Sequence, residues 1–257
     1  MIVSFDSLSD DEKLTFKRLS DLIKIAKYKN ITRFSSFLNP REIEIAIFAC
    51  KKLDFERYMF FGGVASAQRC IFGAFADYDD MDESAFPISI INFSFRKLDS
   101  LSHRDFLGSF MSKQISRESI GDIFVSCDGG VASAICINTI APLLLETFKI
   151  GRVGVRAELG DYLLAQNESS EEEFKKVVSS NRLDVIVSAL GNVSRAKSRE
   201  LVLGGNVQVD YQLITNPSFN IKENSTISIR GFGKFVFKSY DGMSKKGKYI
   251  ISYLKYK

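Results

Sequence analysis

Hydrophobic and polar residues near the N-terminus follow a helical period. Residues 7–30, SLSDDEKLTFKRLSDLIKIAKYKN, begin with capping residues and continue with apolar side chains spaced about 3.6 positions apart. The apolar positions that define this face are Leu14, Leu19, Leu22, Ile23 and Ala26. A second helix is predicted at 39–53, NPREIEIAIFACKKL, where Pro40 suits the first helical turn. The pattern therefore predicts an N-terminal segment of two amphipathic helices, which we place at residues 1–54.

Short strand-type and helix-type patterns alternate between residues 55 and 165. Strands are predicted at ERYMFFGG (56–63), FPISIINFSFR (86–96) and KIGRVGVRAEL (149–159), and a hairpin across Asp128-Gly129-Gly130 in GDIFVSCDGGVASAICIN (121–138). Helices are predicted at SAQRCIFGAF (66–75), SHRDFLGSFMSK (102–113) and TIAPLLLETF (139–148). This order predicts an α+β fold in which helices cover one face of a mainly antiparallel sheet, as in a ferredoxin-like, RRM-like α/β plait.

The polar stretch QNESSEEEF, residues 166–174, is the predicted linker to a smaller C-terminal part. Beyond it, four apolar residues share one face of a short helix: Leu183, Ile186, Val187 and Leu190. A Gly-Asn pair ends this helix, and Ser194 is well placed to cap a second helix that runs to Leu203 and turns Leu201 inward. A double glycine and a Val-x-Val strand pattern at 207–209 follow.

Charge is distributed unevenly along the chain. The net charge of +4 combines 22 Lys and Arg against 26 Asp and Glu in residues 1–180 with 13 against 5 in residues 181–257. Clustered Lys and Arg lower the free energy of a nearby phosphate backbone by releasing condensed counterions. The C-terminal part is therefore a candidate polyanion-binding module. The alternative is a solvated basic tail, for which SKKGKYIISYLKYK at 244–257 would suffice.

The positions of the C-terminal cations favour a compact surface over a tail. Arg195 and Arg199 are four residues apart on the second helix and share a face, and the free N–H groups at its start attract phosphate. The strands of STISIRGFGKFVF would add further cations to this surface. The predicted binding residues are Arg182, Ser194, Arg195, Lys197, Arg199, Arg230 and Lys234.

Other features of the sequence argue against a zinc site, a calcium loop and a membrane span. The four cysteines form no Cys-x-x-Cys pair, and His103 is the only histidine, so we expect buried thiols and no zinc or other cofactor. The acidic stretch DYDDMDE at 77–83 lacks the glycine and terminal glutamate of a calcium loop and is interpreted as solvated. No apolar run approaches the roughly 18 residues of a membrane span, and the N-terminus is acidic, which predicts a cytoplasmic protein. The cysteines are Cys50, Cys70, Cys127 and Cys136.

Residues 181–235 resemble the S4 RNA-binding domain. The shared pattern is Arg-Leu-Asp, then Ser-Arg, a short helix, Gly-x-Val-x-Val and a later strand. The sequence departs from it at Ser198, where Ala is usual, at Asp210, where Asn is usual, and at Thr226, where Asp is usual. The charge of Asp210 is expected to weaken one RNA contact. The resemblance implies an S4 domain with a basic C-terminal extension at 175–257, and it makes the predicted cations RNA-binding residues.

The remaining motifs, in order, resemble the YlmH family over essentially the whole chain. They are FLNPREIEIA, FFGG, LSHRDFLGSFMSKQISRESIGDIFV and IGRVGVRAEL. This resemblance implies a noncatalytic RNA-binding protein, associated with the large ribosomal subunit through ribosomal RNA and tRNA, that acts in quality control of stalled nascent chains. We expect a monomer that carries no cofactor.

Enzymes that carry S4 domains supply the main alternative. MSKKGK and MSKQ lack the Rossmann core and histidine motif of a tyrosyl-tRNA synthetase, and GFGKF is not a Gly-x-Gly-x-x-Gly loop after a strand. Asp184 is followed by VIVSAL within a predicted helix, whereas the Arg-Leu-Asp of pseudouridine synthases precedes Thr-Ser-Gly. An RNA-modifying enzyme of pseudouridine synthase or methyltransferase type, with a divergent central site, stays the second hypothesis. A protein-interaction scaffold is the third.

Overall fold

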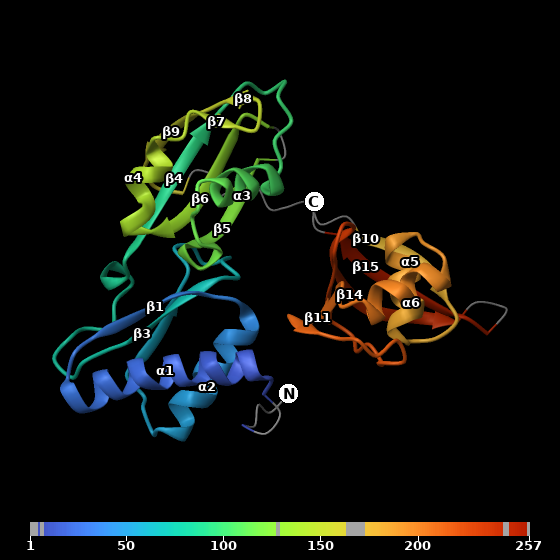
Figure 1. Ribbon diagram of the computed structural model, residues 1–257, viewed down its shortest axis with the longest axis horizontal. Helices are drawn as coiled ribbons and strands as arrows, with labels where there is room; N and C mark the ends of the chain where they lie inside the picture. Colours follow the sequence, from blue (N-terminus) through green and yellow to red (C-terminus); the bar gives the residue numbers. More distant parts are fainter. Residues whose placement is uncertain (1–4, 6–7, 127–128, 163–172, 244–246, 256–257) are drawn as a thin grey trace. The chain divides into compact units, whose positions relative to one another are not determined.

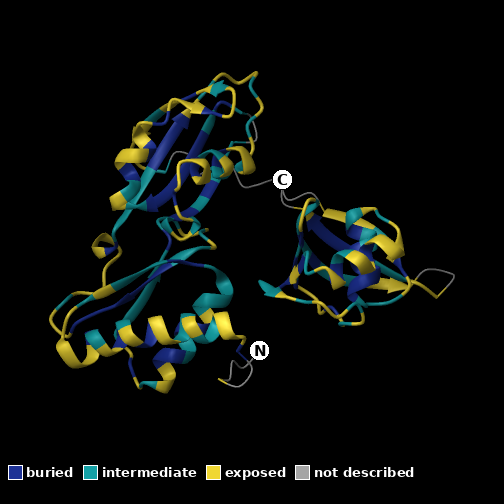
Figure 2. Cartoon of the chain, viewed as in Figure 1, coloured by how far each residue is buried: buried dark blue, intermediate teal, exposed yellow. Residues whose placement is uncertain are grey.

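The computed structural model describes residues 5, 8–126, 129–162, 173–243 and 247–255. The chain forms two compact units, residues 1–168 and 169–257, and each is described by itself (Figure 1). In both units the buried residues concentrate along the strands, and exposed residues lie along the outer sides of the helices (Figure 2). No helix among the described residues is long and apolar enough to span a membrane.

The first unit opens with two capped helices packed on a small sheet. Its elements are α1 (Asp10–Lys29), β1 (Arg33–Leu38), α2 (Pro40–Lys52), β2 (Tyr58–Phe61) and β3 (Cys70–Ala74). Capping boxes formed by Ser9 with Glu12 and by Asn39 with Glu42 begin the helices. Pro40 lies in the first turn of α2, as predicted. The strands pair antiparallel in the order β1-β3-β2. Both helices contribute to one core with this sheet, in which Ile23, Ile45 and Phe72 are fully buried.

Three local predictions in this region are wrong. A strand, β1, separates the two helices, and residues 70–74 form strand β3 instead of part of a helix. β3 is the central strand, so a helix at this position would leave both β1 and β2 without a partner. Leu14 was expected on the buried face of α1, but it is 56% exposed, because the core face runs through Leu19, Ile23 and Ala26.

Residues 88–159 form the predicted ferredoxin-like plait. The elements are β4 (Ile88–Ser94), α3 (His103–Ser112), β5 (Ile120–Val125), β6 (Val131–Ile137), α4 (Ala141–Leu145) and β9 (Arg156–Leu159), with 3-10 turns at Glu83–Ala85, Arg117–Ser119 and Asn138–Ile140. The antiparallel strand order β5-β6-β4-β9 is that of a βαββαβ plait. The β5–β6 hairpin is confirmed, although residues 127–128 of its predicted turn lie outside the described residues. The stretch expected as one strand at 149–159 is divided into β7 (Lys149–Ile150), β8 (Val153–Gly154) and β9.

The two faces of the plait sheet have different partners. Phe106 and Phe110 of α3 and Leu144 of α4 pack with Ile91 and Phe93 of β4 on the helix-covered face. On the other face, apolar residues of the plait join residues of the first sheet in a second cluster, which includes Phe37, Ile71, Phe75, Phe86 and Ile135. This cluster joins the N-terminal sheet and the plait within one unit.

The second unit is a six-stranded sheet with two short helices. Its elements are β10 (Glu173–Val178), α5 (Leu183–Gly191), α6 (Arg195–Leu203), β11 (Val207–Val209), β12 (Gln212–Leu213), β13 (Thr226–Ile229), β14 (Gly233–Met243) and β15 (Tyr249–Lys255). The strand order is β10-β15-β14-β13-β11-β12. One core unites both helices with the sheet, and Ile186, Val202 and Phe237 are fully buried in it. The predicted fold class, α+β with a plait and a C-terminal helix pair on strands, is confirmed.

The domain boundaries stay predictions, but strand pairing bears on them. The proposed boundary at residue 54 separates β1 from its partner β3 and from β2, which pairs with the other side of β3. Most of the predicted linker, residues 166–172, lies outside the described residues, and β10 begins at its end, at Glu173. The division into compact units falls within the predicted linker, between residues 168 and 169.

Candidate nucleic-acid interface

Helix α5 begins where the Arg-Leu-Asp motif places a buried carboxylate beside two arginines. Arg182 is the N-cap residue in extended conformation, and the backbone N–H groups of Leu183 and Asp184 donate to the carbonyls of Phe219 and Pro217 at 2.7 and 3.1 Å. These bonds fix the helix start against the loop before β13. Asp184 is only 3% exposed, which is unusual for a carboxylate and requires compensating partners.

Both partners of Asp184 are predicted binding residues. The Arg182 guanidinium donates to the two carboxylate oxygens at 3.1 and 3.2 Å, and Arg195 Nη2 donates to Oδ2 at 2.8 Å. Burial by itself opposes ionisation of this carboxyl, but the hydrogen bonds and charges of the two arginines prevail and hold the pKa of Asp184 below its ordinary value. The arginine side chains are 42% and 50% exposed, so each guanidinium is held on one side and open to solvent on the other.

Helix α6 follows after a tight turn, as predicted. Asn192 ends α5 in the left-handed conformation, with φ of 51°, and Ser194 begins α6 by accepting a hydrogen bond from the backbone N–H of Lys197 at 3.2 Å. The side chain of Lys197 forms an ion pair with Glu200 at 2.7 Å. Arg199 is exposed and forms no ion pair within the described part of the chain.

The remaining predicted cations come from the sheet. Arg230 is exposed in the turn after β13, and its backbone N–H donates to the carbonyl of Asn206 at 2.9 Å. Lys234 on β14 donates to the hydroxyl of Tyr211 at 2.8 Å and lies 4.9 Å from the centre of the same ring. The structure thus brings Arg182 and Arg195 together directly, and it places the other cations on the helix pair or on the β13–β14 hairpin.

Sequence reasoning missed the organising role of Asp184. The residue was considered only as a catalytic candidate, although a signal was available, because an acidic residue inside an otherwise apolar helix face calls for a buried partner. Tyr211, which holds Lys234, was also missed. It lies in a turn beside Asp210, where both residues have positive φ of 64° and 49°, and no local pattern predicted its contact with β14.

Two departures from the S4 pattern are explained by internal hydrogen bonds. Ser198 is fully buried, and its hydroxyl donates to the carbonyls of Asp184 and Arg195 at 2.7 and 3.0 Å. The carboxylate of Asp210 accepts hydrogen bonds from the backbone N–H of Thr226 at 2.7 Å and from the hydroxyl of Ser225 at 3.1 Å. The carboxylate of Asp210 therefore has internal partners, and its expected effect on one RNA contact stays a prediction.

Leu201 of α6 packs against the core as expected, but it is only partly buried. Val202 is fully buried together with Ser198, which lies one turn earlier on the same face. The helix therefore presents a small buried face and leaves Arg195 and Arg199 on its exposed side.

The Ser194 cap can be tested by its effect on stability. We expect Ser194→Ala to lower the free energy of unfolding by about 1 kcal/mol, because the first N–H groups of α6 lose their side-chain acceptor. Urea denaturation followed by circular dichroism measures this change. Ser218→Ala, at an exposed serine of the same unit, is the matched control and should stay within about 0.5 kcal/mol of the parent. Equal effects of the two substitutions would contradict the assigned cap.

The described cysteines are buried or partly buried and unbridged. They are Cys50, Cys70 and Cys136. Burial raises the pKa of Cys50 and of Cys136 to about 12, so both thiols are protonated at neutral pH and serve as core side chains. Cys127, the fourth cysteine of the sequence analysis, lies outside the described residues.

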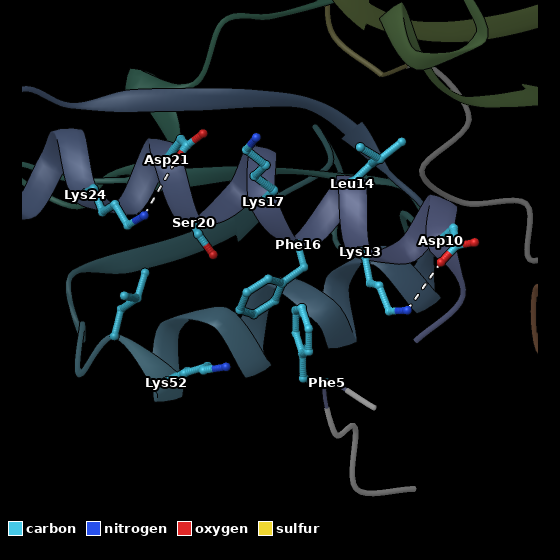
Figure 3. Close-up of a pocket in the computed structure, with 11 residues that line it drawn as sticks. Phe5, Asp10, Lys13, Leu14, Phe16, Lys17, Ser20, Asp21, Lys24 and Lys52 are labelled. Carbon is cyan, nitrogen blue, oxygen red and sulfur yellow. Dashed lines mark hydrogen bonds and ion pairs between the residues drawn. The ribbon is translucent and has the colours of Figure 1, made fainter. Parts of the chain in front are cut away.

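A hollow of about 750 Å³ lies beside α1 in the first unit (Figure 3). Lys52 Nζ lies over the rings of Phe5 and Phe16, at 4.8 and 5.5 Å from their centres. Two other lysines at its rim pair with Asp10 and Asp21 on the same helix. Two of the four lysines that line this hollow are therefore paired with aspartates.

Comparisons with known proteins agree with this arrangement. Residues 181–227 match the family model of the S4 domain, and residues 82–163 match the family described as "Putative RNA-binding domain in YlmH". The chain is 28% identical to the ribosome-associated protein quality control protein P2 of Bacillus subtilis (strain 168) over 95% of each chain. It also shares its fold with the cell division protein ylmH from Streptococcus pneumoniae, with a TM-score of 0.53 and 20% identity, covering 64% of this chain and all of that one.

The order of the two domain matches agrees with the described geometry. The match at residues 82–163 contains the whole plait sheet. The match at residues 181–227 contains Asp184 with its two arginines and the Ser194 cap. Neither match includes the residues that line the hollow beside α1, so we do not place the nucleic-acid interface there. Both matched models describe RNA-binding domains or domains of RNA-binding proteins, and the curated relative is similar from end to end. The chain therefore contains the domain described as "Putative RNA-binding domain in YlmH" at residues 82–163, followed by an S4 domain at its C-terminus.

Proposed function

We propose that this protein binds ribosomal RNA and tRNA on the large ribosomal subunit. There it acts in quality control of stalled nascent chains without catalysing a reaction. The observation that carries the proposal is the Arg182–Asp184–Arg195 arrangement at the junction of α5 and α6. The name of the Bacillus subtilis relative, a ribosome-associated quality control protein, supplies the setting. We place this activity in the cytoplasm.

The geometry supports phosphate binding. The buried carboxylate limits the rotation of two guanidiniums, so less conformational entropy is lost when a phosphate contacts their exposed sides. Arg199 lies one turn along α6 from Arg195 and has no competing carboxylate among the described residues. Such a surface recognises folded RNA mainly by its shape and its phosphates, as expected for ribosomal RNA or tRNA.

Sedimentation with purified large ribosomal subunits tests the proposal. We expect the full chain to pellet with large subunits at low salt and to be released steeply as salt rises, because each phosphate contact releases counterions. Sedimentation with purified small subunits is the matched control. Equal retention on both subunits would contradict the large-subunit assignment, and binding that persists after nuclease removes exposed RNA would favour a protein scaffold.

The enzymatic alternative has its own test. The carboxylate of Asp184, the residue that pseudouridine synthases would use, is held by two arginines and is almost fully buried. Incubation of the protein with ribosomal RNA, with and without a methyl donor, should leave the nucleoside composition unchanged when it is measured by mass spectrometry. Reproducible formation of pseudouridine or of a methylated nucleoside would overturn the noncatalytic proposal.

A further inference from the structure

The open face of a plait sheet is the usual RNA platform in RRM-type domains, where aromatic side chains on the strands stack on bases. In this chain that face is already covered. At the end of the strands nearest the first sheet, Ile135 of β6 is fully buried in a cluster with Phe37, Ile71 and Phe86. Bases therefore have no access to this half of the face.

The other half is covered by a short strap, residues Gly160–Tyr162, that follows the edge strand β9. Gly160 N donates to the carbonyl of Ile90 at 3.2 Å, which continues the β4–β9 pairing. The chain then turns over the sheet face, where Asn92 Nδ2 on β4 donates to the carbonyl of Asp161 at 2.8 Å. Tyr162 then contacts Phe124 on β5 with a ring separation of 5.1 Å.

The strap is built into the sheet face by buried polar partners. Asn92 is 7% exposed, and its Oδ1 accepts a hydrogen bond from the fully buried Ser133 at 2.6 Å. A side chain on Gly160 would approach Asn92 Nδ2 to 3.2 Å, so this close crossing favours glycine. Removal of the strap would leave the amide of Asn92 without its acceptor, which is costly in a buried position.

The two ends of the plait sheet carry opposite charge. The end where β4 begins follows the acidic stretch 77–83, which contains five Asp and Glu residues. The opposite end carries the loops 95–104 and 146–156, which contain six Lys and Arg against two acidic residues, Asp99 and Glu146. We call the six cations the basic loop end: Arg96, Lys97, Arg104, Lys149, Arg152 and Arg156.

Strand pairing shows that these loops meet at one end of the sheet. Ser94, the last residue of β4, pairs with Arg156, the first residue of β9, and with Val131, the first residue of β6. The backbone N–H of Phe95 donates to the carbonyl of Gly130 at 2.9 Å, which holds the start of the 95–104 loop beside the β5–β6 turn.

The side chains of the basic loop end are available. Lys97, Lys149 and Arg152 are exposed and form no ion pair with any residue that the structure describes. Leu98 is 97% exposed and Phe148 is 75% exposed in the same loops, so apolar side chains suited to contact with bases accompany the cations. Arg96 and Arg156 pair with single carboxylates but stay about four-fifths exposed, at 83% and 80%.

We propose that the plait contacts RNA through the basic loop end and not through its sheet face. This inference rests on the proposed RNA-binding function and adds a second RNA contact to that of the S4 domain. Phosphates would approach Lys97, Lys149 and Arg152, while the strap and the first sheet keep the strands closed to bases.

The triple substitution Lys97→Ala/Lys149→Ala/Arg152→Ala in the full chain tests the inference. Binding to in vitro transcribed large-subunit ribosomal RNA, measured by filter binding over a salt series, should weaken about tenfold at low salt, with a salt slope smaller by about two. The control is Lys17→Ala/Lys29→Ala/Lys51→Ala, which removes the same charge from exposed lysines of α1 and α2 and should bind nearly as the parent does.

The outcomes distinguish this inference from the function on which it rests. If the parent binds ribosomal RNA and both triple variants bind it with the parent's affinity, the proposed contact through the basic loop end is contradicted, while the proposed function stands. If the parent fails to bind, the proposed function fails first. Photocrosslinking followed by peptide mass spectrometry gives an independent measurement: nucleotides should attach within 95–104 or 146–156, and attachment at Phe124 or Tyr162 would overturn the closed sheet face.

Discussion

Arg195→Ala/Arg199→Ala is expected to lower the affinity for ribosomal RNA roughly 30-fold, because each charge-assisted phosphate contact contributes on the order of 1 kcal/mol or more. The salt slope should fall by about one to two as two phosphate contacts are lost. Both side chains lie on the exposed side of α6, and alanine is a good helix former, so the folded structure should persist. Filter binding over a salt series measures the first effect, and circular dichroism confirms the second.

The structure separates the two arginines of this test. Arg199→Ala alone removes a cation without an ion pair among the described residues, whereas Arg195→Ala also removes one of two partners of a buried carboxylate. Arg182 still pairs with Asp184 in that variant, so the stability cost stays small. Lys222→Ala/Lys238→Ala removes the same charge elsewhere in the unit and serves as control. A folded Arg195/Arg199 variant with parental affinity and slope would move the interface to Arg230, Lys234 and the C-terminal lysines.

Asp184→Asn should impair both stability and RNA binding. The amide keeps the shape of the carboxylate but places an NH₂ group where guanidinium donors need an acceptor, and it removes the charge that offsets them. We expect a loss on the order of 2 kcal/mol in the free energy of unfolding, together with weaker RNA binding as Arg182 and Arg195 lose their fixed orientation. Urea denaturation and filter binding measure the two effects. Unchanged stability would contradict the anchoring role.

The difference in free energy of unfolding between the parent and Asp184→Asn should depend on pH in one direction. The pKa of Asp184 in the folded protein lies below its ordinary value of 3.8, so the ionised form contributes stability that is fully present above that pH. The contribution is lost as the pH falls below 3.8 towards the folded-state pKa. The stability difference between the parent and Asp184→Asn should therefore be constant from pH 7 to about 5 and shrink in more acidic solution. A difference that grows on acidification would contradict the ion-pair assignment.

The helix pair of the S4 domain was predictable because its signals are local. The spacing of Leu183, Ile186 and Leu190 marks the buried face of α5, and all three are buried in the structure. Ser194 caps α6 as expected, since a capping side chain needs only the N–H groups two or three residues ahead. The plait strands from β4 onward were also predictable, because β-branched and aromatic runs between turn residues carry their own signal.

Contacts between distant segments account for what the sequence did not show. Residues 70–74 carry apolar residues that fit either a helix or a strand, and only pairing with β1 and β2 decides for the strand. The Arg195–Asp184 pair depends on the angle between α5 and α6, and the contact of Lys234 with Tyr211 joins two different hairpins. The closing of the plait face by Gly160–Tyr162 depends on contacts with β4 and β5 that no periodicity of the sequence predicts.

By itself, then, the sequence determined the Ser194 cap, the apolar faces of α5 and α6, and the order of the plait elements, because each depends on neighbours within a few positions. It also determined the concentration of positive charge after residue 180, which depends on composition alone. The tertiary structure alone decided which arginines share Asp184, which groups the Asp210 carboxylate bonds to, and which face of the plait sheet is covered. Those features require residues 11 to 69 positions apart to meet, and the free energy that selects such contacts comes from the packed core and its buried hydrogen bonds.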